Sequence, residues 1–102
     1  MYASPAIRAA ATSAQGAIFL AEGDAANAIE RLTRSMDLWR DANAPYDRAR
    51  TRAMLARALF EQGDEGRARG EELAARTVFE SLGARLDLIR LTEFKAALEA
   101  SH

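Results

Sequence analysis

Apolar residues return every three or four positions along most of the chain, which is the spacing of helices that bury one face. Residues that favour helix ends divide this pattern into five segments. The predicted helices cover about residues 5–22, 25–41, 45–62, 65–82 and 85–100. Strands are not expected, because about a quarter of the residues are alanine and Val78 is the only valine. The sequence therefore predicts an all-α protein.

Short turn motifs mark the ends of these helices. Ser4 can cap the first helix, and Pro5 suits its first position. Later turns pair a residue that ends one helix with a residue that caps or opens the next. Turns this short require consecutive helices to pack as antiparallel neighbours. The turns are expected at Gly23-Asp24, Ala44-Pro45, Gly63-Asp64 and Gly83.

Each predicted helix carries an apolar stripe that we expect to face the core. In the first helix the stripe is Ile7, Ala10, Ala11, Ala14, Ile18 and Ala21. In the second it is Ala28, Ile29, Leu32, Met36 and Trp39. In the third it is Tyr46, Ala49, Ala53, Ala56, Leu59 and Phe60. In the fourth it is Ala68, Ala75, Val78, Phe79 and Leu82.

The sequence also repeats itself at an interval of forty residues, and Ala21-Glu22-Gly23-Asp24 returns as Glu61-Gln62-Gly63-Asp64. Gly16 and Ala56 are small residues at equivalent places, which lets neighbouring helices approach closely. Self-similarity at this period is typical of arrays in which each unit buries its apolar face by stacking on the next. We expect one domain over residues 1–102, with hairpins at 5–41 and 45–82 and a terminal helix at 85–100.

These features resemble the tetratricopeptide repeat family. Its pattern of a small residue, a large apolar residue and an alanine after the turn is matched by Gly16, Phe19 and Ala28, and again by Ala56, Leu59 and Ala68. The period is about six residues longer than the family's usual 34, and Thr12 and Thr51 or Arg52 stand where a tryptophan is usual. The resemblance implies a right-handed array of antiparallel helical hairpins that binds a protein or peptide and is not an enzyme.

Long-helix variants of this repeat are similar to regions of LuxR-type bacterial transcriptional regulators related to the maltose regulator, and of some multidomain cyclases. The similar segments are 44–50, 55–59, 63–64 and 78–85. This resemblance implies the sensor or assembly region of a bacterial, cytoplasmic regulator or signalling protein. The alternative is a small homo-oligomerisation domain or stand-alone adaptor without a peptide groove. The thirteen arginines against one lysine, Lys95, suggest a GC-rich bacterial genome.

Chemistry-bearing motifs are missing from the sequence. The chain has no cysteine, and its only histidine, His102, is at the terminus, so we expect no catalytic site, no metal and no cofactor. A net charge of -1 offers no footprint for nucleic acid or an anionic membrane. The arginines around Gly63-Asp64 do not indicate a DNA-binding helix-turn-helix, because acidic residues surround the turn and the helices are too long.

A binding groove is the remaining candidate site. The resemblance implies that the first helix of each hairpin lines a concave surface, where arginines can pair with a partner's carboxylate. The alternative is that these arginines only solvate the surface. The candidate groove residues are Arg50, Ala53, Arg57, Phe60, Arg90 and Glu93, with Ser13, Ala17 and Ala97 beside them.

The fifth helix carries more large apolar residues than one neighbouring helix can cover. We therefore expect this surface to be buried by a second copy, most simply in a two-fold dimer, or by sequence outside this chain. The candidate self-association residues are Leu86, Ile89, Leu91, Phe94 and Leu98.

Overall fold

A computed structural model describes residues 4–100 of the chain, in which 88% of the residues are helical and no strand occurs. The helices are α1 (Pro5–Ala21), α2 (Ala25–Asp41), α3 (Pro45–Glu61), α4 (Glu65–Leu82) and α5 (Arg85–Ala100). The predicted all-α array of helical hairpins is thus confirmed. The predicted ends of α1 and α3 were each one residue too late. His102 lies outside the described residues.

All four turns share one hydrogen-bond pattern. In the first, the Asp24 N–H donates to the Phe19 carbonyl at 2.9 Å and the Gly23 N–H donates to the Leu20 carbonyl at 3.1 Å. These paired bonds satisfy carbonyls that a helix end would otherwise leave free. The pattern requires a left-handed residue, which is Gly23, Asn43, Gly63 or Gly83 in the four turns. The forty-residue repeat in the sequence therefore reflects equivalent turns. The turn between α1 and α2 matches the turn between α3 and α4, and the turn between α2 and α3 matches the turn between α4 and α5.

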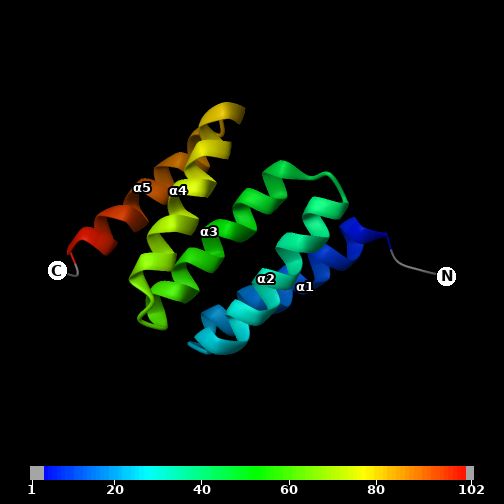
Figure 1. Cartoon of the computed structure of the whole chain (residues 1–102), viewed down its shortest axis with the longest axis horizontal. Helices are drawn as coiled ribbons and strands as arrows, with labels where there is room; N and C mark the ends of the chain where they lie inside the picture. The colour runs from blue at the N-terminus through cyan, green and yellow to red at the C-terminus, as the bar shows by residue number, and fades with distance from the viewer. Residues whose placement is uncertain (1–3, 101–102) are drawn as a thin grey trace.

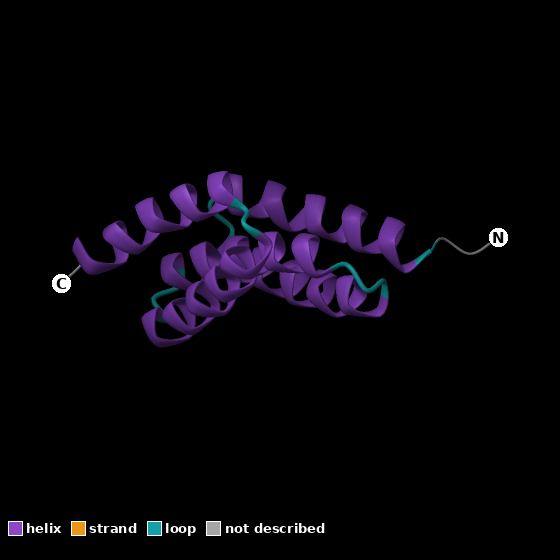
Figure 2. Ribbon diagram, turned by 90° about the horizontal axis from the view of Figure 1, so that it is seen from above, coloured by secondary structure: helices purple, strands orange, loops and turns teal. Residues whose placement is uncertain are grey.

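The five helices follow one another across the molecule in chain order (Figure 1), and the two helices next to the chain ends lie on the same side of it (Figure 2). The hairpin of α1 and α2 lies at one end of the molecule, α3 crosses the middle, and α4 and α5 lie at the other end. The connections are short (Figure 2), so each helix packs antiparallel to the one before it. The chain measures 50 × 31 × 19 Å along its principal axes. This arrangement brings the first helices of the repeats, α1, α3 and α5, to one side of the array.

The core is centred on α3, which packs on α2 and on α4, and most of the residues predicted to face the core are buried there. Ala28, Leu32, Leu59, Ala68 and Phe79 are all buried. The polar side chains inside the core have partners, since the described part of the chain contains no buried polar side-chain atom without a hydrogen bond. The core residues form one cluster that α5 extends with Leu91, Phe94 and Leu98.

The predicted face of α1 is wrong. Ile7 and Ile18 are 64% and 59% exposed, and the alanines between them, Ala10, Ala11 and Ala14, are also exposed. The side that packs on α2 instead carries Ala9 and Gly16. Apolar or small residues occupy most sides of α1 itself. The periodicity therefore indicated a stripe but did not determine which side packs on a neighbouring helix.

Single positions on the other helices also differ from the prediction. Tyr46 and Leu82 are exposed, although both were placed in the core. Three of the α5 self-association residues, Leu91, Phe94 and Leu98, are buried within the chain itself. They are therefore not available to a second copy.

Candidate functional site

A groove runs along the side of the array that α1, α3 and α5 line. It consists of two hollows, one between α1 and α3 with a volume of about 360 Å³ and one between α3 and α5 with a volume of about 150 Å³. Arg50 and Met54 line both hollows, so the two lie next to each other along α3. We call the whole the first-helix groove. Its remaining lining is Ala10, Ser13, Ala14, Ala17, Trp39, Asp47, Thr51, Ala53, Arg57, Phe79, Asp87, Arg90 and Leu91.

Three arginines, Arg50, Arg57 and Arg90, supply the positive charge of the groove. None of them forms an ion pair within the described part of the chain. The Arg57 guanidinium carbon lies 5.1 Å from the ring centroid of Phe94, and that of Arg50 lies 5.9 Å from the ring centroid of Tyr46. Contact with an aromatic face attracts and orients a cation without neutralising it. Both groups therefore remain able to bind an anion.

A hydrogen bond from Tyr46 to Asp87 connects α3 to α5 at the edge of the groove. The phenol donates to Asp87 Oδ2 at 2.7 Å. This bond stabilises the protonated phenol and raises the pKa of Tyr46 above its usual value. The ring of Tyr46 also meets that of Phe79 edge to face, with centroids 6.1 Å apart. These contacts hold the α3 and α5 walls of the smaller hollow at a fixed separation.

The buried hydroxyl of Thr51 connects the helices that line the larger hollow. Thr51 is nearly fully buried, and its Oγ1 accepts a hydrogen bond from Trp39 Nε1 at 2.9 Å and donates to the Asp47 carbonyl at 2.9 Å. Ser13 Oγ lies 3.4 Å from the same atom. One hydroxyl thus connects α1, α2 and α3, so the groove floor is a rigid part of the fold.

The structure brings most of the predicted groove residues together. Arg50, Ala53, Arg57 and Arg90 line the smaller hollow, and Ser13 and Ala17 line the larger one. The structure does not place the other three predicted residues in either hollow. Phe60 instead packs edge to face on Phe94, with ring centroids 6.1 Å apart, while Glu93 and Ala97 are exposed elsewhere on the surface of α5.

Met54 is the central groove residue that the prediction missed. Its position four residues after Arg50 and three before Arg57 places it on the same side of α3. That spacing was available in the sequence. Asp87 was also missed, because its role depends on the approach of α5 to Tyr46, which the helical pattern alone does not fix.

The tetratricopeptide repeat family model matches residues 7–81. This match covers most of the chain, and the chain therefore belongs to the tetratricopeptide repeat family. Comparison with curated proteins and with solved structures gave no match. Family membership supports a protein-interaction module, since these repeats are typically non-enzymatic and generally bind proteins or peptides.

Two other kinds of feature are missing from the described residues. None of their helices has both the length and the apolar character that a membrane crossing requires. Within residues 4–100 no group of three or more acidic, histidine or cysteine side chains could hold a metal ion.

Proposed function

We propose that the first-helix groove binds an acidic peptide segment of a partner protein. The observation that supports this most directly is the presence of three arginines without ion pairs beside an apolar groove floor. Carboxylates form strong charge-assisted bonds with guanidinium groups, and an extended peptide can place alternate side chains in successive hollows. Met54, which is half-buried, supplies the apolar contact between those charges.

The acidic residues of the groove add selectivity to this proposal. Asp87 lines the smaller hollow and Asp47 lines the larger one, so the groove is not uniformly positive. A peptide with negative charge opposite Arg57 and Arg90 is favoured, whereas the same charge opposite Asp47 is repelled. The charge pattern thus determines the register in which the peptide binds as well as the sign of the charge that it must carry.

Charge reversal at Arg50 and Arg57 together is expected to weaken this peptide at least tenfold, because two attractive contacts become repulsive. The probe is an acetylated, amidated octapeptide of alternating aspartate and leucine, measured by fluorescence anisotropy with helicity followed by circular dichroism. The control variant is Arg8→Glu with Arg34→Glu, which changes the net charge equally outside the groove. Equal weakening in both double variants would assign the effect to net charge and contradict the groove site.

For the biological context, we propose the sensor or assembly region of a bacterial transcriptional regulator or signalling protein located in the cytoplasm. Its support is the resemblance of segments 44–50 and 78–85 to the repeat regions of such regulators. The coding sequence around this chain tests the context directly. An ATPase or DNA-binding domain in the same reading frame is expected, and an unrelated stand-alone gene would favour the adaptor alternative.

A second candidate function is self-association through the outer faces of the terminal helices. The observation that favours it is exposed apolar surface at both ends of the array, at Ile7 and Ile18 on α1 and at Leu86 and Ile89 on α5. Exposed patches of this kind commonly mark contact surfaces. The proposed dimer therefore uses only Leu86 and Ile89 of the five residues that the sequence suggested on α5.

Light scattering at micromolar concentration is expected to give about twice the chain mass if this dimer forms. Leu86→Glu with Ile89→Glu should shift the mass toward the monomer, since a carboxylate cannot be buried there without a partner. Lys95→Glu, on the same helix, serves as the control. A wild-type mass of one chain at micromolar concentration would rule out the dimer.

A further inference from the structure

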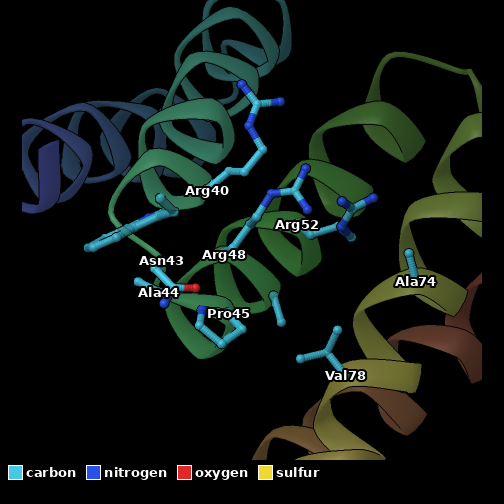
Figure 3. A pocket seen from close by; sticks show the side chains of 10 residues that line it. Arg40, Asn43, Ala44, Pro45, Arg48, Arg52, Ala74 and Val78 are labelled. Atoms are coloured by element: carbon cyan, nitrogen blue, oxygen red, sulfur yellow. The ribbon is translucent and has the colours of Figure 1, made fainter.

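A second pocket lies between α2, α3 and α4, formed by the end of α2, the start of α3 and the middle of α4 (Figure 3). Its volume is about 320 Å³, which is near the lower limit for pockets that hold a ligand. We call it the arginine pocket. It is lined by Trp39, Arg40, Asn43, Ala44, Pro45, Arg48, Ala49, Arg52, Ala74 and Val78.

The lining holds three arginines and no acidic residue. Arg52 is anchored by Glu71 of α4, with Nη1 2.9 Å from Oε2 and both side chains mostly buried. Arg40 has only exposed acidic neighbours, Asp37 at 3.6 Å and Asp41 at 3.7 Å. Exposed pairs of this length contribute little and exchange readily with other anions.

Arg48 is the arginine of this pocket that has no carboxylate partner in the described part of the chain. Its Nε donates to the Met36 carbonyl at 3.2 Å, which fixes the side chain and leaves the terminal nitrogens for other acceptors. The start of α3 also borders the pocket. Its cap residue, Ala44, forms no side-chain hydrogen bond to the N–H groups of that helix end. The positive end of that helix adds to the attraction for an anion.

The opposite wall of the pocket is apolar. Ala74 and Val78 of α4 line it, with Val78 half-buried, and Figure 3 shows both across the pocket from the α3 arginines. Pro45 adds an apolar surface at the start of α3. An occupant must therefore present a negative group on one side and an apolar group on the other. A bare inorganic anion meets only half of that requirement.

We propose that the arginine pocket is a second docking site, occupied by an acidic segment of a partner protein in which a carboxylate adjoins an apolar side chain. The carboxylate binds Arg48 with support from Arg40, and the apolar side chain packs on Pro45 and Val78. A protein segment suits the site because the pocket is open to solvent and three helices border it, so an extended chain gains contacts beyond the pocket. Arg48 and Arg50 lie two residues apart and hence on nearly opposite sides of α3. The two sites can therefore hold two partner segments at once.

The test isolates this pocket in the Arg50→Glu, Arg57→Glu background, where the first-helix groove is disabled. The same aspartate-leucine octapeptide is titrated while the nitrogen-proton NMR signals are recorded. Peptide-dependent shifts are expected at the Asn43 side-chain amide and at the Ala74 and Val78 backbone amides. In that background Arg48→Gln should weaken binding at least fivefold, and Ala74→Glu should do the same by placing a carboxylate at the rim.

Circular dichroism verifies that both variants fold, and Arg34→Glu serves as a surface control that should bind as its parent does. Three results would overturn the proposal. A control octapeptide with asparagine in place of each aspartate could give the same shifts, acetate at the same concentration could reproduce them, or Arg48→Gln and Ala74→Glu could both leave the affinity unchanged. Because the groove is disabled throughout, none of these results bears on the function proposed for it.

Discussion

Replacing Phe79 with alanine is expected to lower the free energy of unfolding by about 3–5 kcal/mol. Phe79 is the largest fully buried side chain and is 1% exposed. It packs in the cluster that joins the two hairpins, and its ring meets Tyr46 of α3. The loss combines the transfer of a ring out of the core with the cavity left behind. Because a domain of this size is stabilised by only about 5–15 kcal/mol, the variant should lose a large part of its stability.

Urea denaturation followed by circular dichroism measures this effect. Leu73→Ala on the same helix is the matched control, because Leu73 is 61% exposed and should change the stability by no more than about 0.5 kcal/mol. Equal losses in the two variants would mean that α4 turns a different side to the core. The comparison therefore tests the orientation of α4, and not only the presence of a core.

The sequence was sufficient to predict the helices and turns because their signals are local. A turn needs one residue that accepts the left-handed conformation, and Gly23, Gly63 and Gly83 supply it. Asp24 and Asp64 cap the following helices with the same 3.2 Å bond from the N–H three residues later. Each of these interactions lies within a few residues of chain, so each can be recognised without knowledge of the fold.

The side of a helix that meets its neighbour was predictable only where one side is apolar. On α2, large apolar residues such as Leu32 and Met36 stand opposite charged ones, and the predicted face is buried. On α1 both sides are apolar or small, so the choice depends on where α2 approaches. The side that α2 approaches carries Ala9 and Gly16, small residues that hydrophobic periodicity does not distinguish from the exposed alanines.

The same distinction explains which sites could be found. The first-helix groove follows one side of α3, and the resemblance to the repeat family, which implies a groove along the first helices, was enough to place Arg50 and Arg57 in it. The arginine pocket needs Arg40 from α2, Arg48 from α3 and Val78 from α4. Nothing in the spacing of these residues along the sequence brings them together. Only the packing of the second hairpin against the first does so.

At Gly16, α1 packs so closely on α2 that a side chain would not fit. A Cβ atom added there would lie 2.6 Å from Leu32 Cδ2 and 2.7 Å from Leu32 Cγ, distances that real side chains do not adopt. Leu32 is completely buried and has no room to move aside. Gly70 on α4 is also helical, but a Cβ added there would meet no atom within 4 Å.

These two glycines give opposite predictions for the same substitution. Gly70→Ala should stabilise the protein by up to about 1 kcal/mol, because alanine favours the helix. Gly16→Ala gains the same helix propensity but overpacks the contact with Leu32, which typically costs about 1–3 kcal/mol, so a net destabilisation is expected. Combining Gly16→Ala with Leu32→Ala should cost less than the sum of the single changes, since the smaller residue makes room for the added methyl group. Thermal and urea unfolding of the four variants measures all of these differences. If Gly16→Ala proved as stabilising as Gly70→Ala, α1 and α2 could not be as close as the structure places them. The position of α1 beside the larger hollow would then be wrong.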